Sequence, residues 1–165
     1  MTAEPAAATP DCRAVIDTSS LVAPSLRRDL QLAAHEGAFA GVWSPWIIAE
    51  LNRILVWHWI KRTNNQLSRD NQRRCSAAAK TMMQILLPTF ILVGPLPPYP
   101  PAWENLRDMW DHPIWAAAKA SDAQYVVSES THDYPPLNTA GEHTHEGITY
   151  LSGRAFLALL KDRQI

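Results

Sequence analysis

The most informative stretch of the chain reads Arg13-Ala-Val-Ile-Asp17-Thr-Ser19. A short apolar run of this kind is typical of a buried strand, and the acid with its hydroxyl neighbours marks the point where the strand ends in a turn. In open α/β sheets the ligand crevice lies outside the carboxyl ends of the strands. Asp17 is therefore the first candidate site residue, with Thr18 and Ser19 orienting it. A turn residue or a helix cap is its structural alternative.

Strands and helices alternate along the rest of the chain. Strands are predicted over 13–17, 39–43, 90–93, 125–128 and 148–151. Helices are predicted over 26–36, 45–60, 68–87, 113–120 and 152–160. The β-α-β-α order predicts an α/β fold, a three-layer α/β/α sandwich with a mainly parallel sheet of about five strands.

The length of 165 residues fits a single domain. We expect that domain over 12–165, behind a disordered leader over 1–11. The most apolar long window, 43–60, carries charged side chains in its middle, which argues against a membrane span.

Charge and cysteine usage restrict the partners and the compartment. Fifteen basic residues stand against sixteen acidic ones, for a net charge of -1, so any surface for a polyanion must be a local patch. Cys12 and Cys75 lie far apart without metal-type spacing, which favours free thiols in a reducing, cytoplasmic setting.

Glu50 is the second candidate site residue. At helical spacing its neighbours are Trp46, Ile47 and Ile54, so it projects from the apolar flank of its helix rather than from the solvated one. A carboxylate in that position needs a partner. The partner is either a metal ion shared with other acids or, as the structural alternative, Arg53 one turn later.

Two more acids complete the candidate set. Asp111 stands just before Pro113, where its alternative role is to cap the following helix, and Asp108 would replace it if the register were shifted. Asp133 follows a predicted strand, and its alternative role is turn formation. Acids that converge without basic partners repel one another, and a divalent cation relieves that repulsion. The sequence therefore predicts a Mg²⁺ or Mn²⁺ site and a metal-dependent phosphodiesterase.

The order of these motifs resembles that of the PIN-domain ribonucleases, a family that includes the toxins of bacterial toxin–antitoxin pairs. The resemblance covers roughly residues 13–160. It rests on four motifs with their expected strands and helices, namely Val15-Ile-Asp-Thr-Ser19, Ser44-Pro-Trp-Ile-Ile-Ala-Glu-Leu51, Asp111-His-Pro-Ile-Trp-Ala-Ala-Ala118 and Val126-Val-Ser-Glu-Ser-Thr-His-Asp-Tyr134.

This resemblance implies a PIN-like fold and a metal-dependent endoribonuclease, the toxin of a toxin–antitoxin pair. It implies that Asp17, Glu50 and Asp111 hold one Mg²⁺ (or Mn²⁺), and that Asp133 assists them or holds a weaker second ion. Ser128 would be the small hydroxyl that orients water or phosphate. An RNA substrate, a protein antitoxin and a homodimer are implied by the same route.

Two features depart from the family pattern. Ser130 stands where the family often has Asn or an acid, which puts the strength of a second metal site in question. The loop over 137–147 is long, and its Glu142-His143-Thr-His145-Glu146 could bind a transition metal, although histidines in a polar loop are more often solvated.

Basic side chains gather around the two long helices, near two tryptophans that could stack on bases. This group is interpreted as an RNA-binding patch or as an ordinary solvated helix face, and it comprises Arg53, Lys61, Arg62, Arg69, Arg73 and Arg74, with Trp57 and Trp59.

Two rival functions come from other classes. One is a catalytically inactive PIN-like module that binds RNA or protein. The other is a phosphoacceptor or phosphatase that uses an aspartyl-phosphate, which needs a second acid beside Asp17 and a lysine near a later strand end. Asp17 is followed by Thr-Ser, and Lys119 falls inside a predicted helix, so the second rival is disfavoured.

Overall fold

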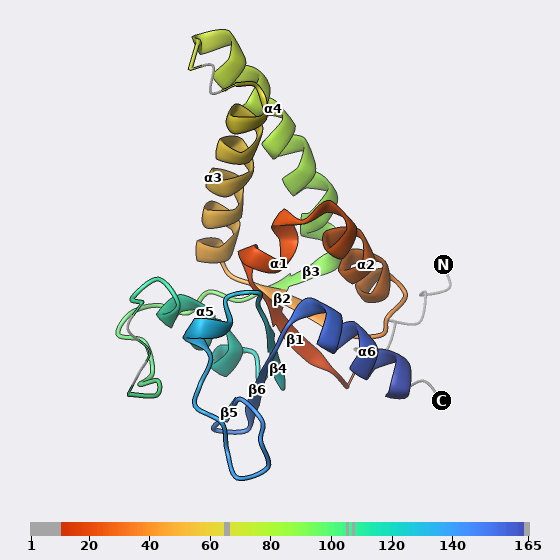
Figure 1. The fold of residues 1–165 in the computed structure, drawn as a ribbon, viewed down its shortest axis with the longest axis vertical. Coiled ribbons are helices and arrows are strands. Elements are labelled where there is room, and N and C mark those ends of the chain that lie inside the picture. The colour runs from red at the N-terminus through yellow and green to blue at the C-terminus, as the bar shows by residue number, and fades with distance from the viewer. Residues whose placement is uncertain (1–10, 65–66, 105, 107, 164–165) are drawn as a thin grey trace, which may run out of the picture.

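A computed structural model describes residues 11–64, 67–104, 106 and 108–163. The predicted leader over 1–11 lies outside the described residues except for Asp11. Helices and strands alternate along the chain (Figure 1), and their bounds are β1 Arg13–Ile16, α1 Thr18–Val22, α2 Pro24–His35, β2 Ala40–Trp43, α3 Pro45–Arg62, α4 Arg69–Leu86, η1 Leu87–Thr89, β3 Phe90–Leu92, α5 His112–Ala120, β4 Tyr125–Val127, η2 Thr131–Asp133, β5 Thr144–His145, β6 Ile148–Leu151 and α6 Gly153–Arg163.

The strands form one mostly parallel sheet with the order β3-β2-β1-β4-β6-β5. Val15 of β1 lies opposite Val42 on one side and Val126 on the other. The prediction of a mainly parallel α/β sheet is confirmed. A sixth strand adds to the five predicted, because the loop over 137–147 supplies β5, which pairs antiparallel with β6 at the edge.

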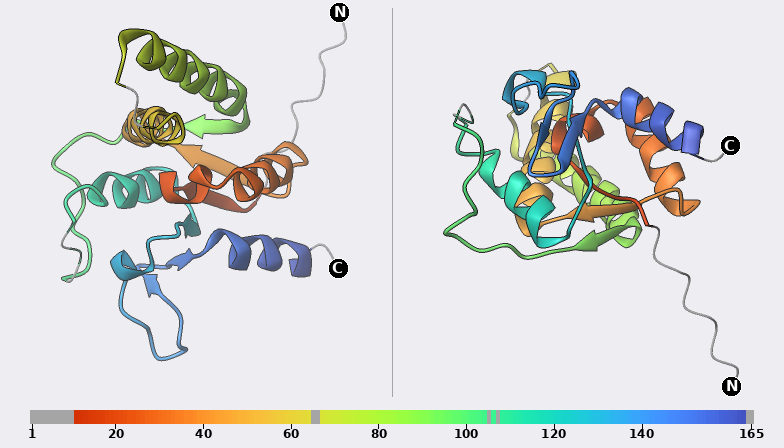
Figure 2. Two further views of the ribbon diagram at one scale, coloured as in Figure 1. Left: turned by 45° about the horizontal axis from the view of Figure 1, so that its top comes forward. Right: turned by 90° about the horizontal axis from the view of Figure 1, so that it is seen from below.

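The crossover connections place helices on both faces of the sheet. Strand order runs outward from β1 through β2 to β3 and then returns to β4 on the other side of β1. Right-handed crossovers therefore place the helices that precede β2 and β3 on one face and α5, which precedes β4, on the other. Helix α5 packs against β1, β2 and β4, whereas α2 and α6 pack together on the other face (Figure 2). This arrangement is compatible with a three-layer α/β/α sandwich.

The central strands are buried on both sides, as their uninterrupted apolar runs predict. Val15, Ile16, Val126 and Val127 are fully shielded from solvent. Gly41 on β2 has a packing role, because a Cβ atom there would lie 2.3 Å from Cδ1 of Phe90. The missing side chain lets β3 and its aromatic ring approach β2.

The chain after β1 forms a helix rather than the predicted turn. β1 ends at Ile16, and the Asp17 side chain accepts a hydrogen bond from the Thr18 amide as the N-cap of α1. The three hydroxyl residues that favour a turn in the sequence are here the first turn of this short helix. Asp17 therefore does cap a helix, which is its structural alternative, and its side chain also faces the candidate site.

Helices α3 and α4 form a long antiparallel arm that extends from the sheet (Figure 1). Both begin within a residue of their predicted starts, and each has a serine N-cap: Ser44 accepts a hydrogen bond from the Ile47 amide, and Ser68 accepts one from the Asn71 amide. The basic residues near the far end of the arm are exposed. Among the described helices, none is both long and apolar enough to cross a membrane.

Candidate functional site

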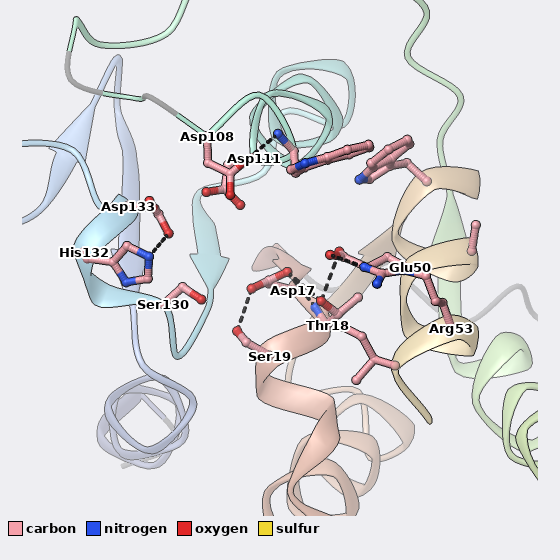
Figure 3. A pocket seen from close by; sticks show the side chains of 14 residues that line it. Asp17, Thr18, Ser19, Glu50, Arg53, Asp108, Asp111, Ser130, His132 and Asp133 are labelled. Atoms are coloured by element: carbon pink, nitrogen blue, oxygen red, sulfur yellow. Dashed lines mark hydrogen bonds and ion pairs between the residues drawn. The ribbon is translucent and has the colours of Figure 1, made fainter. Parts of the chain in front are cut away.

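A cavity of about 750 Å³ opens at the carboxyl ends of β1 and β4, where the strand order reverses. Such a reversal is where open α/β sheets place their ligands. Acidic and hydroxyl side chains from separate segments face the cavity (Figure 3), and its polar lining comprises Asp17, Thr18, Ser19, Glu50, Arg53, Asp108, Asp111, Ser130, His132 and Asp133. The four predicted acids are therefore brought to one cavity.

Asp17 is fixed by the strand that ends before it and by hydroxyl donors around it. Its amide donates to the Val127 carbonyl, which ties the end of β1 to β4. Its Oδ1 accepts the Thr18 amide at 2.7 Å, and its Oδ2 accepts the Ser19 hydroxyl at 2.6 Å and the Ser128 hydroxyl at 2.8 Å. Only 4% of Asp17 is exposed, so these donors take the place of water in stabilising its charge.

Thr18 connects the first two acids. Its hydroxyl lies 3.1 Å from Oε2 of Glu50 and 3.3 Å from Oδ1 of Asp17, and its single proton can serve one of them at a time. Burial and the charge of Asp17 raise the pKa of Glu50. The Arg53 alternative is also present but loose, with Arg53 Nη2 at 3.8 Å from Glu50 Oε1 and its own side chain 65% exposed.

Asp111 occupies the N-cap position of α5, yet its side chain makes no capping hydrogen bond. Its Oδ2 is buried and has no hydrogen-bond partner among the described residues. Burial, followed by the charges of Asp133, Asp17 and Asp108, raises the pKa of Asp111 to about 7. The capping explanation therefore does not account for this side chain, which faces the other acids instead.

Asp133 and Asp108 complete the acidic wall. Asp133 lies in η2, the turn expected for it, and one oxygen contacts Nε2 of His132 at 2.7 Å. Asp108 lines the cavity beside Asp111 rather than replacing it, and it accepts a hydrogen bond from the Trp110 amide at 2.9 Å. The sequence predicts Asp108 only as a substitute for Asp111, whereas the structure has both side chains at the cavity.

Ser128 lies behind the acids rather than in the cavity. Its hydroxyl donates to Asp17 and accepts the Ser130 amide at 3.1 Å, while the Ser19 hydroxyl accepts the Glu129 amide at 2.9 Å. Tyr134 donates to the Ser128 carbonyl. In this structure Ser128 thus orients Asp17, and the hydroxyls that face the cavity are those of Thr18, Ser19 and Ser130.

The histidines of the loop over 137–147 are half-buried against aromatic side chains. His143 lies against Tyr134, with Nδ1 at 2.7 Å from the Pro135 carbonyl, and His145 lies against Trp103 and Trp115. Their two-residue spacing along an edge strand places both on the aromatic side of the hairpin.

The donor set of the cavity suits a hard cation, since it consists of carboxylate and hydroxyl oxygens. The orphaned Oδ2 of Asp111 is a buried acceptor of the kind that a cation satisfies. As the side chains stand, however, no three His, Cys, Asp or Glu groups in the described ranges are close enough together to hold one metal ion. Asp17, Glu50, Asp111 and Asp133 would have to close on a cation by side-chain movement.

Two tryptophans at the cavity were missed as a feature of the site. Trp46 and Trp110 stack with ring centroids 5.0 Å apart and an interplanar angle of 17°. The signal in the sequence was their spacing, since Trp46 lies one helical turn before Glu50 and Trp110 directly precedes Asp111.

No protein-family model matches this chain, and no curated protein matches it.

Proposed function

We propose that this chain is a metal-dependent endoribonuclease that hydrolyses RNA phosphodiester bonds with Mg²⁺ or Mn²⁺. The observation that carries the proposal is the meeting of Asp17, Glu50, Asp111 and Asp133 in one cavity, where burial and mutual repulsion raise the pKa of Asp111. Structural carboxylates normally have a cation or a set of donors of their own, and Asp111 Oδ2 has neither among the described residues.

Asp17, Glu50 and Asp111 would hold the ion, with Asp133 beside them, and the bound ion would supply a nucleophilic hydroxide and charge stabilisation for the phosphoryl oxygens. The hydroxyls of Ser19 and Ser128 donate to Oδ2 of Asp17 and fix the position of this carboxylate at the cavity. The Thr18 hydroxyl lies between Asp17 and Glu50 and can donate its single proton to either carboxylate. Ser130 faces the cavity, where it can donate to a phosphate oxygen.

The motif resemblance extends the proposal to a PIN-like nuclease that acts as a toxin, with a protein antitoxin and a homodimer as partners. The contact between Arg53 and Glu50 favours the runner-up, an inactive module that binds RNA or protein, because a paired Glu50 is less available to a metal.

The decisive experiment incubates the purified chain with labelled total RNA, with Mg²⁺ or Mn²⁺ and with a chelator. We expect metal-dependent fragments, and their loss in Asp111→Asn. Asp122→Asn is the matched control, since Asp122 is exposed and its backbone φ of 51° suits asparagine. Intact RNA with every metal, together with RNA binding in a gel-shift assay, would favour the inactive module.

A further inference from the structure

A stacked pair of indole rings forms part of the wall of the acidic cavity. Trp46 comes from the first turn of α3, and Trp110 comes from the turn before α5. The rings are nearly parallel, at 17°, and 56% of Trp110 is exposed. Trp110 therefore offers solvent an aromatic surface that is backed by a second ring.

The backbone fixes this pair relative to the acids. Trp46 lies one helical turn before Glu50, so both side chains project from the same side of α3. Trp110 directly precedes Asp111, and two hydrogen bonds to Asp108 hold their turn, one from the Trp110 amide to Oδ1 at 2.9 Å and one from the Asp111 amide to the carbonyl at 3.1 Å. A group stacked on Trp110 would lie next to the acids.

The acidic lining of the cavity repels a polyanion, so electrostatic attraction gives such a ligand little affinity here. Its wall carries five acids, and the basic side chains among its described lining residues are Arg53 and His132. Each of these already contacts an acid, at 3.8 Å for Arg53 with Glu50 and 2.7 Å for His132 with Asp133. Even with a cation bound, a substrate needs a source of binding energy that does not depend on charge. Stacking on an aromatic ring supplies about 1–3 kcal/mol per nucleobase and tolerates any base.

We propose that Trp110, backed by Trp46, is a stacking platform for the nucleobase next to the phosphate held at the acids. The buried Nε1–H of Trp46 has no acceptor among the described residues, and an unsatisfied buried donor in a native fold requires an explanation, of which a functional role is one. The choice of a nucleotide as ligand rests on the proposed function, but stacking itself needs no hydrolysis.

The test compares two ligands that differ by the base alone, adenosine 5′-monophosphate and ribose 5-phosphate. Neither contains a phosphodiester, so binding is measured without turnover, by titration calorimetry or ligand-observed NMR with Mg²⁺ present. We expect wild-type protein to prefer the nucleotide by about 5- to 150-fold, the range that corresponds to one stacked base. We expect Trp110→Ala to reduce that ratio to near one and Trp110→Phe to retain most of it.

Met109→Ala is the matched control. Met109 is 71% exposed and directly precedes Trp110 in the chain, but it does not line the cavity. This variant should keep the wild-type ratio. Thermal melts establish that each variant is folded before the titrations are compared. Equal affinity for the two ligands in wild-type protein, or an unchanged ratio in Trp110→Ala, overturns the platform.

The same samples separate this inference from the nuclease proposal. If RNA stays intact with every metal while the base preference is present and is lost in Trp110→Ala, the platform stands and the nuclease proposal fails. If RNA is cleaved but the two ligands bind equally, the platform fails and the nuclease proposal stands.

Discussion

Asp111 holds a carboxyl group where burial and three neighbouring acids all oppose its ionisation. The unfolded chain ionises this group near its ordinary pKa of 3.8, whereas the folded protein holds the proton up to about pH 7. Between these values the folded state binds more protons than the unfolded state, so stability falls as the pH rises through this window. Above pH 7 the full penalty is present.

The first prediction concerns Asp111→Asn in metal-free protein. Asparagine is neutral at every pH and can donate to Asp133, so the variant should be more stable than wild-type protein at pH 8. We expect a gain of about 1–2 kcal/mol in the free energy of unfolding, a value reduced for the partial exposure of the group. Urea titrations at pH 8 and pH 4 measure it, and the gain should disappear at pH 4. A variant less stable than wild-type at pH 8, with Asp122→Asn unchanged, would show that the raised pKa of Asp111 is incorrect.

Ser128 gives the second prediction, because it holds the buried Asp17 carboxylate at 2.8 Å. Ser128→Ala removes one of the two hydroxyl donors to Oδ2 and leaves the Ser130 amide without its acceptor. We expect a loss of about 1–2 kcal/mol in the free energy of unfolding, since hydrogen bonds to charged groups are the stronger kind. Denaturant unfolding measures the loss, and Ser76→Ala on the exposed side of α4 is the control. Equal stabilities for the two variants would contradict this role.

The elements of the fold followed from the sequence where one local signal determined them. Short apolar runs predicted all five parallel strands to within a residue, and the starts of α3 and α4 were also predicted to within a residue. β5 was missed because a strand of two residues, Thr144–His145, is defined by its pairing with β6 and not by its own pattern.

In the candidate site, too, local sequence signals predicted some features, whereas others depend on tertiary contacts. Convergence of the acids followed from their positions at strand and helix ends, which the parallel topology brings together. The hydrogen bond from Ser128 to Asp17 joins residues 111 positions apart, and the stack of Trp46 on Trp110 joins a helix to a turn. Contacts of that separation depend on the tertiary packing of side chains. The sequence places each tryptophan near a candidate acid, but it has no local signal that pairs the two rings.

The third prediction belongs to the β2–β3 pair. Gly41→Ala would place a Cβ atom 2.3 Å from Phe90 Cδ1. The Phe90 ring cannot easily move, because it stacks on the Trp43 ring with their centroids 4.2 Å apart. We expect a loss of about 1–3 kcal/mol in the free energy of unfolding from overpacking. β2 leads directly into α3, so the arm that carries Glu50 should also be less well fixed.

Gly94→Ala is the control for that change, because a Cβ atom there meets nothing within 4 Å. It should leave stability unchanged or raise it by about 0.4–1 kcal/mol, since alanine restricts the unfolded chain. If the two variants have the same melting temperature, the close packing of β3 on β2 is wrong.

On the scale of the whole molecule, the candidate site joins four segments that are distant in the chain. The acids come from the end of β1, from α3, from the start of α5 and from η2. Folding therefore brings negative charges together that the unfolded chain keeps apart. A cation that binds this cavity would bind the folded protein and not the unfolded one, and would stabilise the entire domain by mass action.

The fourth prediction follows from this linkage and from the proposed metal site. Mg²⁺ or Mn²⁺ should raise the melting temperature, and the increase should be larger at pH 8 than at pH 5.5. The reason is that Asp111 keeps its proton at pH 5.5, so the ion must displace that proton before it can bind, whereas at pH 8 the carboxylate is already ionised. Asp111→Asn should lose most of the increase at pH 8, and Asp122→Asn should keep it. A melting temperature that does not respond to either ion at either pH would leave the acids without the cation that we propose for them.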